Sequence, residues 1–222
     1  MDDPRIALLV AAHEPTDALR NFRREVPASL LEFQVTDGEL PDGPDVDGFL
    51  VTGSKASVYD AADWIRETES WVADAVDAGL PGLGVCFGHQ LIASALGGTV
   101  EDMGEYELGY REVTHREDPI FDGIDSPSLA FETHSDGVTQ LPDGARQLAE
   151  NDYGIQAFRA GPAVGVQFHP EYDLQTASRI AREKDVPEEK RDRVLAGVTA
   201  ENRRRAAEAA LVFENFLAEI VE

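Results

Sequence analysis

The chain has 222 residues, of which 42% are hydrophobic, enough for one α/β domain with a substantial core. It carries 43 acidic and 19 basic residues, for a net charge of −24, which argues against free nucleic acid as a partner because phosphate binding needs clustered cations. No run of about 18 uninterrupted apolar residues occurs, so we expect no membrane-spanning segment.

The first half of the chain alternates predicted strands with predicted helices. Its start, Met1-Asp2-Asp3-Pro4-Arg5, lacks the basic and apolar regions of a signal peptide, so we expect a cytoplasmic protein. Turn residues predict a loop at 39–45. Apolar patterns predict the remaining elements, which are strands at 5–10, 30–35, 48–53 and 81–85 and helices at 16–24, 64–78 and 89–96.

The middle of the chain changes to short strands separated by turn signals, which are expected at 107–114, 128–133, 146–150, 154–159 and 163–168. Alternating strands and helices followed by a run of strands indicate an α/β fold. We expect an open, mostly parallel sheet flanked by helices, with a smaller antiparallel β layer. No linker or repeat divides the chain, so the prediction is a single domain over 1–222.

The last part of the chain returns to helix, and we interpret residues 174–222 as a helical C-terminal extension. The stretch 184–193 is highly charged and is predicted to be solvated. Thr199 is a plausible N-cap for the final helix. An apolar stripe then predicts that this helix packs on the sheet, through Ala206, Ala210, Phe213, Leu217 and Ile220.

The most informative motif is Gly84-Val85-Cys86-Phe87-Gly88, between a predicted strand and a predicted helix. It has the form of a nucleophile elbow, with Cys where serine hydrolases carry Ser. Glycines on both sides permit a turn too tight for side chains, and a helix N-terminus favours a thiolate. The alternative for a lone cysteine is a small buried core residue. One cysteine cannot form an internal disulfide, which agrees with a reducing cytoplasm.

About eighty residues later, the predicted strand at 163–168 ends in His169-Pro170-Glu171. His169 is the candidate base that takes the thiol proton and later returns it to the leaving amine. Glu171 would orient the imidazole and favour its cationic form. The alternative for Glu171 is a surface carboxylate in a turn. Together with Cys86, these residues predict a Cys-His-Glu triad.

With these two motifs, the chain resembles the class I, triad-type glutamine amidotransferases, and within them the stand-alone group related to the glutaminase part of GMP synthase. The resemblance covers about residues 45–175 and implies a flavodoxin-like sheet. It implies an oxyanion hole formed by the backbone N–H groups of Gly53 and Phe87. It also implies that Gln90 contacts glutamine. The backbone of His134-Ser135-Asp136 is then expected to hold the α-amino and α-carboxylate groups of glutamine. Glu107 and Gly109 resemble a Glu-x-Gly segment that lies near the site in the family.

Two segments depart from the commonest family pattern. Many members have Gly-Gly-Pro before a Ser, whereas this chain has Thr52-Gly53-Ser54. Dedicated GMP synthase subunits often begin with a loop like Asn-Gly-Gly-Gln after the first strand, and here the sequence is Ala11-Ala12-His13-Glu14-Pro15. The second departure favours a general GMP synthase-like protein over the true subunit.

The sequence does not support a second catalytic base, a metal site or a cofactor site. His89 is the rival base, but on the helix it is expected to point away from the thiol, and we assign it a structural role. His13 and His115 have no partners at ligand spacing, so we predict no metal site. The chain has no phosphate-binding loop and no dinucleotide fingerprint, so we predict no cofactor. Activation of an acceptor would therefore come from a separate synthetase.

Three functions remain open at this point. The first is a glutaminase that hydrolyses glutamine and passes ammonia to that synthetase. The second is a stand-alone hydrolase of γ-glutamyl peptides or amides with the same triad, which differs from the first in the room beyond the amide nitrogen. The third is a non-catalytic regulatory relative, which the intact Cys86, His169 and Glu171 argue against.

The charge itself leads to a hypothesis about the source. Only three residues are lysine, so arginine carries most of the positive charge. A net charge of −24 destabilises the compact state by self-repulsion unless salt screens it. The hypothesis is a protein of an extreme halophile, and the alternative is an ordinary acidic mesophile enzyme.

Overall fold

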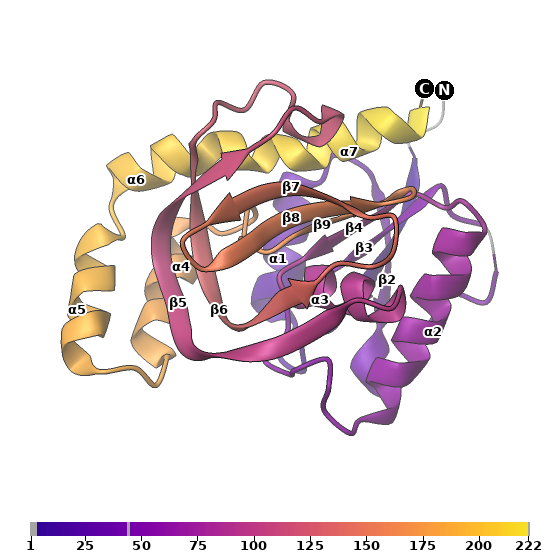
Figure 1. Cartoon of the computed structure of the whole chain (residues 1–222), viewed down its shortest axis with the longest axis horizontal. Coiled ribbons are helices and arrows are strands. Elements are labelled where there is room, and N and C mark those ends of the chain that lie inside the picture. The colour runs from indigo at the N-terminus through magenta and orange to yellow at the C-terminus, as the bar shows by residue number, and fades with distance from the viewer. Residues whose placement is uncertain (1–3, 44, 222) are drawn as a thin grey trace.

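A computed structural model of the chain describes residues 4–43 and 45–221. Asp2 and Asp3, on which the expectation of no signal peptide rests in part, lie outside the described residues. The described strands form one mixed nine-stranded sheet in the order β2-β1-β3-β4-β9-β8-β7-β5-β6 (Figure 1). The predicted α/β class and sheet type are confirmed.

The parallel half of the sheet consists of five of the described strands. In sheet order these are β2 (Ser29–Gln34), β1 (Arg5–Val10), β3 (Gly48–Val51), β4 (Gly82–Val85) and β9 (Ala163–Val166). All but β2 are almost wholly buried, because helices cover both faces of a parallel sheet. Successive residues of β1 therefore belong to two different cores.

One core contains Ile6, Leu8 and Val10, and the other contains Ala7 and Leu9. Alternation along a strand explains this division, since neighbouring side chains point to opposite faces. The first face is covered by α1 (Thr16–Glu25) and α7 (Leu211–Val221), and the second by α2 (Asp63–Asp77) and α3 (Phe87–Ala95).

The antiparallel half continues the same sheet beyond β9. It consists of β8 (Gly154–Ala160), β7 (Arg146–Asn151), β5 (Thr99–His115) and β6 (Ser128–Gln140). β5 and β6 form a long bent pair (Figure 1). The pairing register shifts between Asp102 and Glu107, where Gly104 has a φ of 73°. β5 thus begins eight residues before the predicted strand at 107–114.

The C-terminal helix packs on the sheet as predicted. α6 (Ala200–Arg205), a 3-10 turn at Ala206–Ala210 and α7 follow one another, and the Thr199 side chain caps α6 by accepting from the Asn202 N–H. Phe213 meets Phe22 of α1 with ring centroids 5.7 Å apart. No helix of the described residues has the length and apolar character needed to span a bilayer.

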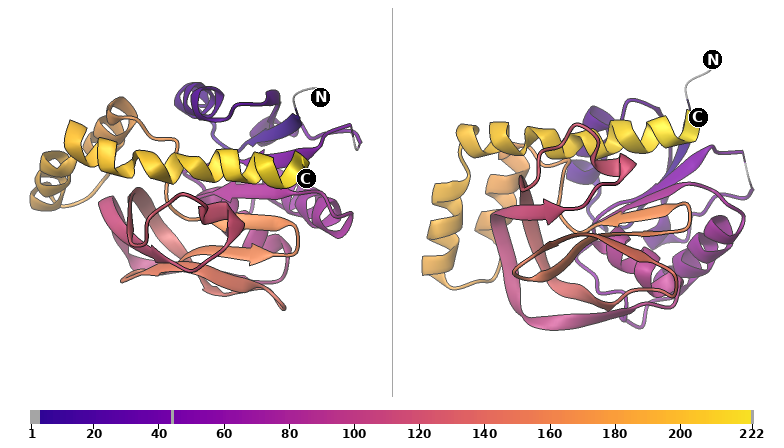
Figure 2. Two further views of the ribbon diagram at one scale, coloured as in Figure 1. Left: turned by 90° about the horizontal axis from the view of Figure 1, so that it is seen from above. Right: turned by 45° about the horizontal axis from the view of Figure 1, so that its top comes forward.

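The segment between the sheet and α6 is more ordered than predicted. α4 (Leu174–Glu183) and α5 (Glu188–Gly197) lie together at one end of the molecule, beside β5 and β6 (Figure 2). The prediction of a solvated stretch at 184–193 holds for its acids, which are exposed. It is wrong for Lys184, Lys190 and Arg191, which are half-buried against neighbouring backbone and aromatic groups.

Candidate active site

Three adjacent parallel strands deliver the predicted catalytic residues to one edge of the sheet. Gly53 lies two residues after β3, Cys86 directly follows β4, and His169 lies three residues after β9. β4 is the middle strand of the three. The carboxyl ends of parallel strands meet at one edge of a sheet, which is where ligands of open α/β folds bind.

Cys86 has the backbone geometry of a nucleophile elbow. Its φ of 54° and ψ of −103° make it the one non-glycine residue with positive φ in the described part of the chain. Such geometry is strained and persists where the surroundings impose it. Here the surroundings are two glycines, because a Cβ on Gly84 would lie 2.3 Å from the Gly88 backbone and one on Gly88 would lie 2.4 Å from the Val51 carbonyl oxygen.

His169 and Glu171 form a buried pair beside the thiol. The imidazole Nδ1 lies 2.8 Å from Glu171 Oε1, which leaves Nε2 for the sulfur. Burial by itself would lower the pKa of His169, but the negative charges of Glu171 and of a Cys86 thiolate raise it to about 10. The imidazole is therefore a cation at neutral pH. Tyr172, which the sequence motifs do not indicate, stacks on it with centroids 4.1 Å apart.

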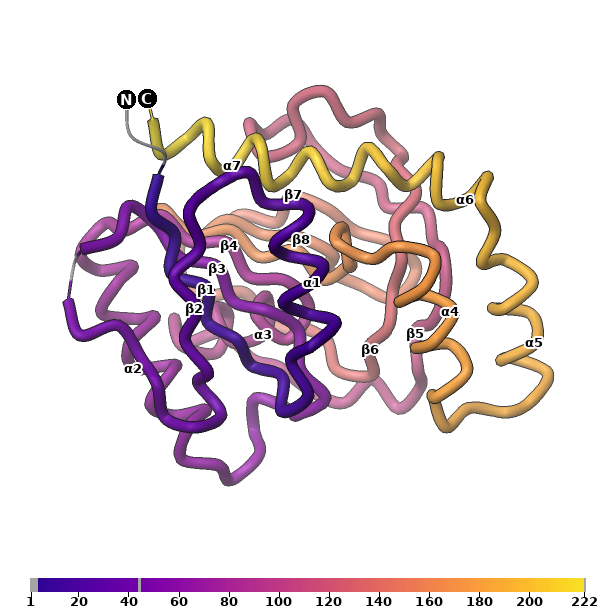
Figure 3. Tube along the Cα trace, turned by 180° about the vertical axis from the view of Figure 1, so that it is seen from behind, coloured from indigo at the N-terminus to yellow at the C-terminus, as the bar shows by residue number. Residues whose placement is uncertain are grey.

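α1 lies beside the segment that leads from β9 into α4 (Figure 3), and arginines of α1 bind the loop in this segment that carries Glu171. Arg24 donates to the main-chain oxygen of Glu171 and to the Asp173 carboxylate. Arg20 donates to Asp173 and to the Thr176 hydroxyl. Asp173 also caps α4, since its side chain accepts from the Thr176 N–H at 2.7 Å. These contacts fix Glu171, the predicted third member of the triad, from outside the site.

Gly53 lies beside the side chains of Cys86 and His169. A Cβ at this position would lie 3.0 Å from His169 Cε1 and 3.7 Å from Cys86 Cβ, so only glycine leaves this space open. Phe87 is the first residue of α3, where a backbone N–H has no partner within its own helix. The two positions predicted for the oxyanion hole therefore border the sulfur from two sides.

The predicted substrate-binding residues meet at one segment of β6, His134-Ser135-Asp136. The main-chain oxygen of Asp136 accepts from Gln90 Nε2 at 3.0 Å and is 2.9 Å from His134 Nδ1. Its carboxylate accepts from the hydroxyls of Ser57 and Tyr59. Ser135 lies between these anchors. This segment of β6 is thus bonded to α3 and to the loop after β3.

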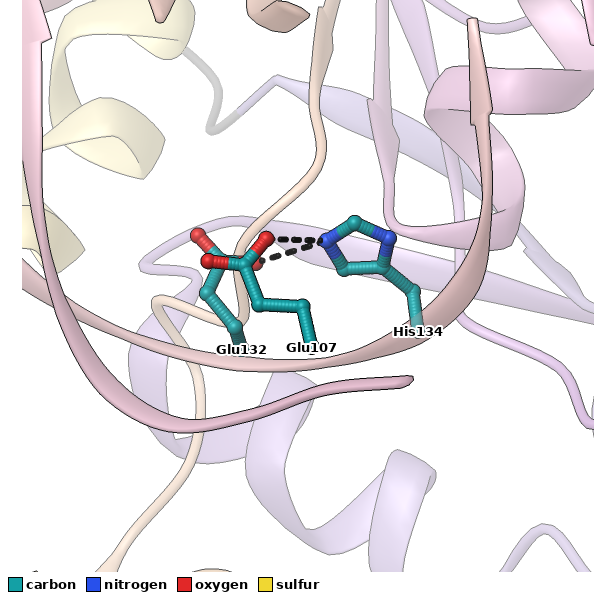
Figure 4. Close-up of side chains that lie close together, drawn as sticks. All are labelled: Glu107, Glu132 and His134. Carbon is teal, nitrogen blue, oxygen red and sulfur yellow. Dashed lines mark hydrogen bonds and ion pairs between the residues drawn. The ribbon is translucent and has the colours of Figure 1, made fainter. Parts of the chain in front are cut away.

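His134 also belongs to a buried charged cluster with Glu107 and Glu132 (Figure 4). Its Nε2 is 2.8 Å from Glu107 and 3.5 Å from Glu132, and both carboxylates are fully buried. Burial acts to lower the pKa of His134, but bonds to the two carboxylates raise it well above its ordinary value. These three could by position hold a metal ion, a cluster that the sequence does not predict. Both ring nitrogens face acceptors, however, which is the arrangement of an imidazolium.

The match to known proteins agrees with this geometry. The family model described as glutamine amidotransferase class-I matches residues 17–184. This chain belongs to that family. The Thermotoga maritima glutamine amidotransferase has a TM-score of 0.79 at 20% identity, over 98% of this chain and 99% of that one, which shows a shared fold.

Two curated relatives of this amidotransferase are named for different activities. Gamma-glutamyl peptidase 5 of Arabidopsis thaliana is 32% identical over 160 residues, which cover 67% of this chain and 64% of that protein. GMP synthase (glutamine-hydrolyzing) of Thermus thermophilus is 44% identical over 97 residues, covering 42% of this chain and 19% of that protein. The chain therefore matches about a fifth of the GMP synthase.

Two cavities meet at the candidate catalytic residues of the amidotransferase. The smaller, of about 110 Å³, is lined by Cys86, Phe87, Gln90 and residues 134–136 of β6. The larger, of about 560 Å³, is lined by His169, Glu171 and residues of α1 and α4. Four residues line both cavities, namely Ser54, Lys55, Thr133 and Lys184. The sequence motifs do not identify this shared rim.

His89 takes the structural place that the sequence predicts. Its ring is fully buried, meets Phe158 with centroids 4.9 Å apart, and lies against Gly165, where a Cβ would be 2.8 Å from Nδ1. Burial lowers the pKa of His89 to about 3, so it stays neutral. Of the other two histidines, His13 lies edge-on to Trp64 and His115 stacks on Phe121.

Proposed function

We propose that this amidotransferase hydrolyses the side-chain amide of glutamine through a γ-glutamyl thioester on Cys86. The observation that carries this proposal is the strained elbow at Cys86 beside the ion pair of His169 and Glu171. A thiolate is the nucleophile, and an adjacent imidazolium and a helix N-terminus both favour it.

The proposed reaction has two steps, which are formation of the thioester and its hydrolysis. The thiolate attacks the amide carbon of glutamine, and the negative charge on the oxygen is stabilised by the N–H groups of Gly53 and Phe87. The carbon–nitrogen bond breaks as His169 gives its proton to nitrogen, and ammonia leaves. His169 then takes a proton from water, which attacks the thioester, and glutamate and the free thiolate result.

The γ-glutamyl part fits the cavity of about 110 Å³. We assign its α-amino and α-carboxylate groups to the segment His134-Ser135-Asp136 of β6. Gln90 Nε2 is used by the Asp136 oxygen, so the Oε1 of Gln90 is the atom that we assign to glutamine. The likeness to GMP synthase supports transfer of the ammonia to a separate synthetase.

A second candidate function is hydrolysis of γ-glutamyl peptides by the same thioester. The larger cavity favours it, because ammonia is about the size of a water, roughly 30 Å³, whereas about 560 Å³ is the range of pockets for small organic ligands. The identity to gamma-glutamyl peptidase 5 over two thirds of the chain also supports it.

The test is glutamate release from L-glutamine by the purified chain in molar KCl, beside Cys86→Ala and Cys86→Ser. We expect turnover that falls by about a thousandfold or more in both variants, since removing a nucleophile from a triad has at least this effect. Turnover that persists in Cys86→Ala would contradict the proposal. Cys86 is the one cysteine of the chain, so trapping it with iodoacetamide gives an unambiguous control of thiol access.

A further inference from the structure

The lysines of this chain have an uneven distribution in space. The sequence has three lysines among 19 basic residues. Lys55 and Lys184 line both cavities at the catalytic residues. The third, Lys190, donates to the main-chain oxygen of Tyr106, which lines the smaller cavity. In a chain of net charge −24, all of its lysines are thus grouped around the active site.

Lys184 is the cation in this group that is free to meet a ligand. Its ammonium lies 4.7 Å from the centre of the Tyr106 ring, and within residues 4–43 and 45–221 no carboxylate lies at ion-pair distance from it. Arg179, which lines the same cavity, is paired at 2.6 Å with both Asp17 and Glu183. Lys55 is largely exposed and lies 3.5 Å from an equally exposed Glu14, an arrangement that contributes little.

Lys184 lies next to the space that the leaving group of a γ-glutamyl substrate would occupy. His169, which protonates the departing nitrogen, lines the larger cavity, whereas Cys86 lines the smaller one. A substrate whose γ-glutamyl part fills the smaller cavity must therefore place everything beyond the amide nitrogen in the larger one. Lys184 stands at the junction, at the edge of the space that this leaving group enters.

We propose that the larger cavity is a leaving-group subsite for an amino acid or short peptide, and that Lys184, assisted by Lys55, binds its carboxylate. The substrate class is then a γ-glutamyl peptide in which the departing amine carries a carboxylate. This inference rests on the proposed thioester chemistry at Cys86. The carbon–nitrogen bond breaks as before, with His169 giving its proton to the amine of the leaving amino acid.

The walls of the cavity fit such a leaving group. Ala12, Ala18 and Ile180 provide apolar surface, which suits the body of an amino acid, while Thr133 adds a hydroxyl at the junction. Three acids line this cavity: Glu171 is bonded to His169, Asp17 is paired with Arg179, and the exposed Glu14 lies 3.5 Å from Lys55. The charge left to attract a ligand is therefore positive at the junction, although the molecule as a whole is strongly negative.

The experiment compares kcat/KM for three substrates in 3 M KCl: L-glutamine, γ-glutamylglycine and γ-glutamylglycinamide, which lacks the carboxylate. We expect γ-glutamylglycine to be preferred over γ-glutamylglycinamide by about tenfold or more, the range for a hydrogen bond to a charged group. In Lys184→Met, which keeps an apolar stem over Tyr106, this preference should disappear. Lys184→Arg should restore much of it.

The matched control is Arg193→Met, which removes the same charge from an exposed position on α5 and should keep the preference. Hydrolysis of glutamine with no activity on either γ-glutamyl compound would overturn the subsite and leave the proposed glutaminase intact. An equal loss on all three substrates in Lys184→Met would place Lys184 at the γ-glutamyl part and also overturn it. Activity on none of the three by the unaltered chain would overturn the proposed function itself.

Discussion

At the scale of single residues, the site combines one strained backbone with three carboxylate–imidazole contacts. Cys86 is held at positive φ, while His169 is bonded to Glu171 and His134 lies between Glu107 and Glu132. The pKa of each imidazole is raised because neighbouring negative charges outweigh the effect of burial. Their tasks differ, since we assign proton transfer to His169 and support of the substrate-binding segment of β6 to His134.

Replacing Glu171 with Gln tests this division at the catalytic pair. The pKa of His169, about 10 in the folded chain, should fall toward its ordinary value near 6.5 once the carboxylate charge is gone. The alkaline limb of a pH profile of kcat/KM should then move down by more than about one pH unit. Tyr172→Phe keeps the stacked ring and should leave the limb in place. A limb that does not move in Glu171→Gln would contradict this account of the imidazolium.

The same shift makes a prediction about stability. His169 has a higher pKa in the folded chain than in the unfolded one, so its contribution is fully present below about pH 6.5 and is lost as pH rises through about 10. Thermal unfolding between pH 7 and 10 should show a decline in melting temperature that is smaller in Glu171→Gln. An equal decline in both proteins would assign the effect to other groups.

At the scale of elements, close approach between β4, α3 and β3 creates the elbow. The glycines at 84 and 88 allow this approach because their missing side chains would overlap neighbouring backbone. The elbow motif predicts β4 and α3, and the alternation of strands and helices predicts a parallel sheet, because both patterns are encoded within short stretches of sequence. Packing between distant segments is not encoded in this way.

Gly88→Ala measures how tight this packing is. The added methyl group would lie 2.4 Å from the Val51 carbonyl oxygen, and we expect a loss of about 3 kcal/mol in the free energy of unfolding. Gly197→Ala is the matched control, because a Cβ there meets nothing within 4 Å and the backbone φ is not positive. Urea unfolding followed by circular dichroism compares the two, and similar midpoints would contradict the prediction.

The sequence predicts poorly those elements that are stabilised by packing between distant segments of the chain. β5 begins at Thr99, and charged residues together with the bulge near Gly104 hide the alternation of its first half. α5 has one buried residue, Val194, so its helical pattern is weak. Lys184 and Tyr172 reach the site because α4 folds back beside β5 and β6, and no local motif indicates this contact.

At the scale of the whole molecule, charge is the dominant feature. The chain carries 43 acids against 19 bases, and the basic groups are largely arginines that form ion pairs along α1, β8 and α4. The Asp118 carboxylate forms ion pairs with Arg146 and Arg159, and, against the effect of burial, these two arginines lower its pKa. Arg159 also forms an ion pair with Glu219 on α7. Such bonds act locally, whereas repulsion among the remaining acids acts across the surface and is screened by salt.

We therefore expect the melting temperature to rise between 0.1 and 3 M KCl. A gain of about 4–8 °C corresponds to about 2 kcal/mol for a chain of this size. A melting temperature indifferent to KCl would argue for an ordinary acidic protein. Because high salt also strengthens apolar burial, sodium chloride and potassium chloride should be compared at equal concentration, and a similar gain in both is expected from screening.

The grouping of the three lysines has a practical consequence for chemical labelling. Because Lys55 and Lys184 line the two cavities and Lys190 is bonded to Tyr106 at their edge, a mild acylating reagent directed at side-chain amines acts as a footprinting reagent for the face that holds the candidate site. Digestion and mass spectrometry would then locate each acylated lysine. A small molecule that slows acylation of Lys184 more than that of Lys55 would report that the junction is occupied, without any need for turnover.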